Sequence, residues 1–163
     1  MFLLVFLTGT FAAATAQPGT SLTPQHSPEP QQKSSPAEDI SGMYSFLHEG
    51  EFVQIDLQGD AMTGYISRQG DTESDHGAFL DQWFSKGAVT GHDVTFTTRP
   101  LHGVVFEFKG KFERGPAKTK DTDGYYVLSG TLTRIVTANQ KTTSQSRQVE
   151  FKLLGQPQEE PKK

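Results

Sequence analysis

The chain contains no cysteine, and this absence removes several classes of function. Disulfide frameworks, thiolate zinc sites, iron–sulfur clusters, cysteine nucleophiles and a lipid anchor on an N-terminal cysteine are all excluded. An excess of basic charge is also missing, because 15 Lys and Arg stand against 19 Asp and Glu, a formal net charge of −4. We therefore expect no nucleic-acid partner, since such partners require a basic surface. No cofactor-binding motif stands out, and we expect no cofactor.

A long hydrophobic run is missing as well. The most apolar stretch, residues 1–16, is interrupted by small and polar residues at 8–10 and ends in Ala-Thr-Ala at 14–16. A membrane-spanning helix needs about 20 apolar residues, whereas a short apolar block before small residues is typical of a cleaved signal peptide. We expect a secreted or periplasmic protein with no stable membrane anchor after signal cleavage. Export without cysteine favours a bacterial source, since small secreted animal domains usually depend on disulfides.

The distribution of proline and glycine divides the rest of the chain. Residues 17–40 hold five of the nine prolines and few apolar side chains, so we expect a disordered linker there. Residues 156–163 are polar, and we expect a disordered tail. Residues 41–155 hold 14 of the 16 glycines, a turn signal about every eight residues, which predicts one domain of short antiparallel strands.

Alternation of apolar and polar residues predicts the strands. Over residues 102–113, Phe106 and Phe108 fall on one face and Glu107 on the other, the pattern of a half-buried strand. Similar or weaker alternation occurs in seven other segments: 42–48, 51–57, 62–68, 88–90, 94–99, 124–135 and 147–154. We predict an all-β fold, a single antiparallel up-and-down eight-stranded barrel, because closure removes exposed edges. A two-sheet β-sandwich is the alternative.

One segment predicts a helix instead. Phe79 and Trp83 are four residues apart, as are Leu80 and Phe84, which is the spacing of one face of a two-turn amphipathic helix. We expect this short helix to plug one mouth of the barrel, either as part of the core or as a lid.

Two segments carry a resemblance to a known group of barrels. Residues 41–67 combine Gly-x-aromatic, a Gly hairpin, an aliphatic alternation and Gly-x-Tyr, and YYVLSGTLT follows at residues 125–133. This resembles the calycin group of small secreted barrels, of the avidin and lipocalin type. The resemblance implies a cup that holds a small molecule. It does not imply biotin binding, because the avidin pocket needs several tryptophans and this chain has only Trp83.

Two polar groups are candidates for a binding site. The acidic loop 71–76 ends in Asp75 and His76, and its carboxylates resemble the start of a calcium loop, but His76 replaces the glycine that such a loop needs. We therefore expect no metal. Arg99 and His102 flank a proline turn, where Arg99 suits an anionic group and His102 suits proton transfer. In an up-and-down barrel these are the third and fifth connections, so they share a rim. The predicted ligand-binding residues are Asp75, His76, Trp83, Arg99 and His102.

Charge is divided unevenly along the domain. Residues 38–93 carry 11 acids and 2 bases, whereas residues 94–155 carry 5 acids and 10 bases. This dipole suits docking on a protein partner or head-to-tail association. The leading hypothesis is an exported, non-enzymatic β-barrel that binds a small molecule or a protein partner. The alternatives are a hydrolase or lyase that uses His102 with a carboxylate of the loop, and a structural envelope or matrix protein, whose interior would be filled by aromatic and leucine side chains.

Overall fold

The computed structural model describes residues 38–59, 61–70 and 73–155. These residues belong to the second of two units into which the chain divides, residues 34–163. The predicted signal peptide, nearly all of the predicted linker and the predicted tail lie outside the described residues. Within the described part, no helix has the length and apolar character needed to cross a membrane.

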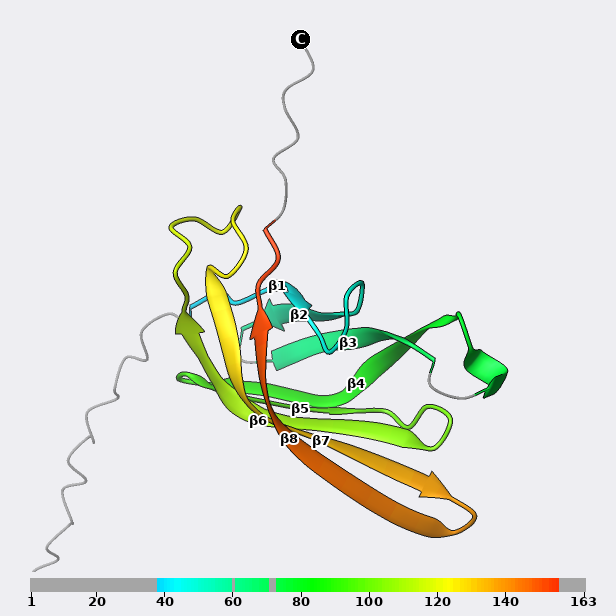
Figure 1. The fold of residues 1–163 in the computed structure, drawn as a ribbon. Helices are drawn as coiled ribbons and strands as arrows, with labels where there is room; N and C mark the ends of the chain where they lie inside the picture. The colour runs from blue at the N-terminus through cyan, green and yellow to red at the C-terminus, as the bar shows by residue number, and fades with distance from the viewer. Residues whose placement is uncertain (1–37, 60, 71–72, 156–163) are drawn as a thin grey trace, which may run out of the picture. The chain divides into compact units, whose positions relative to one another are not determined.

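Eight strands form one antiparallel sheet in which each strand pairs with the next along the chain. The strands are β1 (Gly42–Ser45), β2 (Phe52–Gln58), β3 (Ala61–Gln69), β4 (Phe79–Thr90), β5 (Asp93–Thr98), β6 (Val104–Arg114), β7 (Tyr126–Ala138) and β8 (Lys141–Lys152). The sheet curls into a half-barrel (Figure 1). The predicted all-β, up-and-down, eight-stranded architecture is confirmed, and a single sheet takes the place of the two sheets of a sandwich.

The first and last strands meet at one end only. Tyr44 forms an isolated antiparallel bridge with Leu153, and the Leu154 amide donates to the Met43 carbonyl at 2.8 Å. β1 has only four residues and β8 has twelve, so β1 is too short to pair along the rest of β8. The β7–β8 hairpin consequently extends away from β1 (Figure 1). We call the end that holds the Tyr44–Leu153 bridge the closed end and the opposite end the open end.

The predicted helix is wrong within the described residues, because Phe79–Phe84 lies in β4. Trp83 pairs with Tyr65 of β3, and Phe79 pairs with Gln69 of the same strand. A spacing of four residues fits a strand as well as a helix, since four is a multiple of the two-residue strand period. The only helical turn that the structure describes is a 3₁₀ turn of three residues, Glu73–Asp75.

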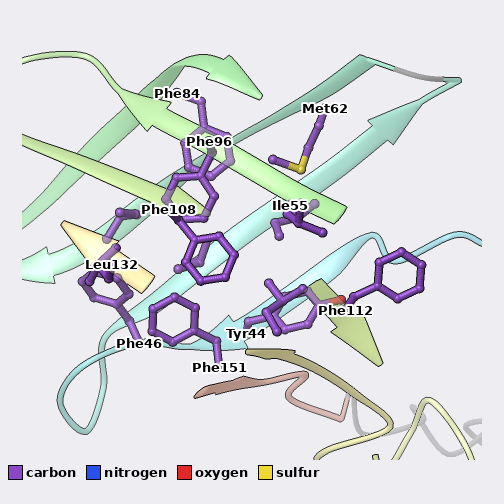
Figure 2. Close-up of a cluster of buried hydrophobic side chains, with 14 of the residues drawn as sticks. Tyr44, Phe46, Ile55, Met62, Phe84, Phe96, Phe108, Phe112, Leu132 and Phe151 are labelled. Atoms are coloured by element: carbon purple, nitrogen blue, oxygen red, sulfur yellow. The ribbon is translucent and has the colours of Figure 1, made fainter. Parts of the chain in front are cut away.

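Aromatic side chains fill the inner face of the half-barrel. Phe96 stacks on Phe84 at 4.5 Å and on Phe108 at 5.2 Å, measured between ring centroids. Figure 2 shows these rings together with residues of β1, β2, β3, β7 and β8. The four side chains expected to fill a packed interior are all buried: Phe106, Phe108, Tyr126 and Leu128. The centre of the half-barrel is therefore a packed core, and any inner site must lie nearer an end.

The closed end is held by contacts from residues that precede β1. The Tyr126 hydroxyl donates to Glu38 Oε1 at 2.8 Å, and Lys120 Nζ donates to the Asp39 carbonyl at 2.7 Å. Ile40 is fully buried, and its carbonyl accepts a hydrogen bond from the Tyr44 hydroxyl at 2.7 Å. Burial, and then the hydrogen bond to Glu38, raise the pKa of Tyr126 to about 12. Residues 38–40 thus pack on the sheet and close this end.

Candidate ligand-binding site

Two of the residues predicted from sequence meet at the open end. His102 Nδ1 lies 2.7 Å from Asp75 Oδ2, within hydrogen-bond distance. Asp75 ends the 3₁₀ turn in the β3–β4 connection, and His102 lies in the β5–β6 connection. The prediction that these two connections share a rim is confirmed by this contact.

Backbone geometry explains why His102 reaches the loop. The Leu101 amide donates to the Val104 carbonyl and the Val104 amide to the Leu101 carbonyl, so residues 102–103 form a two-residue hairpin turn. His102 and Gly103 have φ angles of +48° and +76°. Positive φ at both central residues is typical of a type I′ turn, which matches the twist of the flanking strands. The turn holds the imidazole at the rim, where half of it remains exposed.

The other predicted residues do not join this pair. Trp83 lies on the outer face of β4, with its ring 4.7 Å from that of Tyr65, and does not cover the open end. Arg99 is the backbone neighbour of Trp83, because its amide donates to the Trp83 carbonyl at 2.7 Å. His76 is exposed in the β3–β4 connection. The structure therefore divides the predicted set into a rim pair, Asp75 and His102, and an outer-face pair, Trp83 and Arg99.

Three arginines occupy inward positions near the open end. Arg68 follows Gly64 and Ile66 on the inner face of β3, in step with the two-residue period. Arg134 continues the inner row of β7 after Leu132, and Arg147 pairs with Leu132 across β7 and β8. An arginine that continues an inward row of apolar residues brings a charge toward the core. Burying that charge costs free energy unless it is paired or solvated.

Arg68 is held by a buried amide. Its Nε donates to Gln82 Oε1 at 3.4 Å, its Nη1 donates to the Gln69 carbonyl at 3.1 Å, and its guanidinium lies 5.4 Å from the centre of the Phe106 ring. The Gln82 Nε2 donates in turn to Thr98 Oγ1 and to the carbonyls of residues 99 and 104, at 2.8–2.9 Å. Gln82 and Arg68 are 1% and 3% exposed, so this network fixes the orientation of the guanidinium inside the sheet.

A cavity of about 250 Å³ opens at these arginines. We call it the arginine cavity; it is lined by Phe46, Leu47, His48, Glu51, Arg68, Gln69, Gly70, Phe106, Arg134 and Arg147. Its wall therefore combines the β1–β2 and β3–β4 connections and the end of β3 with the inner faces of β6, β7 and β8. A smaller cavity of about 110 Å³ lies beside it and shares Arg134 and Arg147.

Among the described residues, the lining of the arginine cavity has an excess of positive charge, with three arginines and the carboxylate of Glu51. Glu51 is 6% exposed, and both its oxygens accept backbone hydrogen bonds, from the Gln69 amide at 3.0 Å and the His48 amide at 3.1 Å. That carboxylate is thus engaged in shaping the two connections. Guanidinium groups bind carboxylate and phosphate oxygens in pairs, and the arrangement is suited to an anionic group.

A third hollow, about 740 Å³, is a groove on the outer face of β4, β5, β6 and β7. Threonine and lysine side chains dominate its lining, including Thr95, Thr131 and Lys109. It contains no buried charge and is open to solvent. Nothing in its lining selects one ligand chemistry, so the arginine cavity is the better candidate.

The strand alternation of the sequence contains a signal for the arginine cavity. Extending the alternation of residues 124–135 by one step places Arg134 inward, and extending that of residues 147–154 backward places Arg147 inward. Clusters of polar residues in the connections point instead to Asp75 and His102. Among the described residues, no group of three or more His, Asp or Glu is placed to hold a metal ion.

Comparison with known proteins adds no relative to this description: no protein-family model and no curated protein matches the chain. What the structure supports of the calycin resemblance is the architecture, an eight-stranded antiparallel sheet curled into a half-barrel.

Proposed function

We propose that this domain is an exported, non-enzymatic binding protein for a small anionic molecule, which it holds in the arginine cavity. The observation that carries the proposal is the convergence of Arg68, Arg134 and Arg147 on one cavity next to the apolar side chains of Phe46 and Phe106. Arg68 supplies a fixed guanidinium from β3, and the other two face the cavity from β7 and β8.

The size and lining of the cavity limit the ligand. Typical sites for drug-sized molecules are about 300–1,000 Å³, so a cavity of about 250 Å³ suits a smaller one. Phe46, Leu47 and Phe106 give part of the wall an apolar surface. A short organic acid or a small phosphate ester fits these features, with its charged group on the arginines.

An enzyme that uses His102 is the second candidate, because His102 lies 2.7 Å from the carboxylate of Asp75. A carboxylate in this position orients an imidazole for proton transfer. Neither residue, however, lines the arginine cavity. Binding therefore has stronger support than catalysis. The residues predicted from sequence around Arg99 and His102 are the alternative ligand site, which the experiment must distinguish from the arginine cavity.

Isothermal titration calorimetry of the wild-type protein with hexanoate, hexyl phosphate and inorganic phosphate tests the proposal, with hexylamine as the cationic control. We expect at least one anion to bind and the amine not to bind. Replacing Arg134 and Arg147 by Gln should weaken anion binding by about tenfold or more, because each charge-assisted hydrogen bond contributes about 1.5–3 kcal/mol. Both side chains border solvent-accessible space, so the double variant should fold.

Arg99→Gln is the matched control, since Arg99 is an exposed arginine outside the cavity. Its binding should equal that of the wild type. A loss in Arg99→Gln or His102→Gln, with binding kept in the Arg134 and Arg147 variant, would move the site to the rim and outer-face residues. Absence of binding for all three anions would refute the proposal.

A further inference from the structure

The outer face of β4 presents a short row of aromatic and acidic side chains. Phe79, Asp81 and Trp83 alternate with inward residues and therefore point to the same side of the strand. Phe79 and Trp83 are each 55% exposed and are the large apolar side chains with the highest exposure in the described part of the chain. Residues two apart in a strand are about 6.6–6.8 Å apart, so Asp81 stands between two exposed rings.

The row is supported from β3 and β2. The Trp83 ring packs on Tyr65 at 4.7 Å, and the Tyr65 ring meets that of Phe52 edge-on at 5.8 Å. Ser67, which pairs with Asp81, is only 5% exposed although it lies on this outer face. The Trp83 ring is therefore held in place by its neighbours, and the low exposure of Ser67 shows that side chains of this face cover it.

The row belongs to the acidic half of the domain. Residues 38–93 contain 11 acids and 2 bases, and one of the two bases, Arg68, is buried on the inner face. Within the described residues Asp81 takes part in no salt bridge. Arg99, the backbone neighbour of Trp83, places a cation next to the Trp83 end of the row. An isolated carboxylate between two exposed rings in an acidic region is complementary to a cation with an apolar stem.

We propose that the Phe79–Asp81–Trp83 row is a docking surface for an extended protein segment that carries lysine or arginine. The cationic head pairs with Asp81, and the aliphatic stem lies across the two rings, where tryptophan gives the strongest cation–π attraction. The acidic half of the domain attracts such a segment from a distance. This surface is independent of the arginine cavity, which opens on the opposite face of the sheet and selects the opposite charge.

The chain provides its own reporter for this proposal, because Trp83 is its single tryptophan. Octalysine is titrated into the full-length protein at 20 mM salt while Trp83 emission is recorded, with octaglutamate and maltohexaose as the acidic and neutral probes. We expect a saturable emission change with octalysine only, and a weaker affinity at 300 mM salt, where the screening length is shorter.

Two charge reversals separate local recognition from general attraction. Asp81→Lys and Asp93→Lys change the net charge equally, and both residues are exposed, but Asp93 begins β5 beside Thr90, at the far end of β4 from the row. The dissociation constant should rise about tenfold in Asp81→Lys and no more than about threefold in Asp93→Lys, because only the first loses a contact. Phe79→Ser leaves the charge unchanged and should also weaken binding several-fold.

Four results would overturn the proposal. These are equal effects of the two reversals, no emission change with octalysine, a change with maltohexaose instead, and a change that depends on protein concentration without added peptide. The third result would assign the row to saccharides, and the fourth would assign it to a second copy of the chain. None of the four involves the arginine cavity, so they leave the proposed small-anion binding intact.

Discussion

Gln82→Leu tests the buried network and the strand assignment of β4 together. The leucine removes the two N–H donors of the amide, which three neutral acceptors share, and each donor is worth about 1 kcal/mol net. It also removes the long bond at 3.4 Å from Arg68 Nε, which we value at about 1 kcal/mol because of its length. Burying an apolar side chain in place of an amide returns about 1–2 kcal/mol. We therefore expect the free energy of unfolding to fall by about 1–2 kcal/mol.

Equilibrium urea unfolding, followed by circular dichroism, measures this change. Gln58→Leu is the control, because Gln58 is an exposed residue of β2 and its replacement should shift stability by no more than about 0.5 kcal/mol. In a helix of residues 79–84, Gln82 would lie opposite the apolar face and its replacement would also have little effect. A change in Gln82→Leu no larger than that in Gln58→Leu, about 0.5 kcal/mol, would therefore refute both the network and the strand.

Two further predictions follow from the core and from the closed end. Phe106→Ala should cost about 3–5 kcal/mol, the range for a buried ring, whereas Glu107→Ala on the outer face should cost no more than about 0.5 kcal/mol; similar effects in chemical denaturation would contradict the alternation. Burial raises the pKa of Tyr126 to about 12 and raises the pKa of Tyr44 as well. The protonated phenols therefore contribute stability that is fully present below about pH 10, the pKa of an unfolded tyrosine. This stability is lost as the pH rises through the pKa values of the folded state. Absorbance at 295 nm should show both ionising late, and Tyr126→Phe should remove one late step; early ionisation of both would contradict the packing.

The strand pattern could be predicted from sequence because each strand buries one face. The alternation of buried Phe106 and Phe108 with exposed Glu107 is the pattern of a half-buried strand, and the structure places all three as expected. The start of β4 could not be predicted in the same way. Phe79 and Trp83 are apolar but lie on the outer face, so the apolar residues of Phe79–Phe84 do not mark the core and the segment mimics a helix.

The candidate site could be predicted only in part. Asp75 and His102 are 27 residues apart, and strand order alone was enough to bring their connections to one rim. Arg134 and Arg147 could not be ranked as site residues from charge alone, because most arginines lie on the surface. Their significance depends on the inward phase of β7 and β8 and on the third arginine across the cavity, which only the curvature of the sheet brings close.

The short first strand has a consequence for how molecules reach the arginine cavity. Because β1 pairs with β8 only near Leu153, a seam without backbone pairing runs along β8 from there toward the hairpin. Arg147 is on β8 and Leu47 is in the β1–β2 connection, so residues from both sides of this seam line the cavity. For the proposed small-anion binding, entry beside β8 would break no backbone pairing between β1 and β8. Entry and exit should then both be fast, and affinity for the correct anion should depend on the lifetime of its arginine contacts rather than on its rate of arrival.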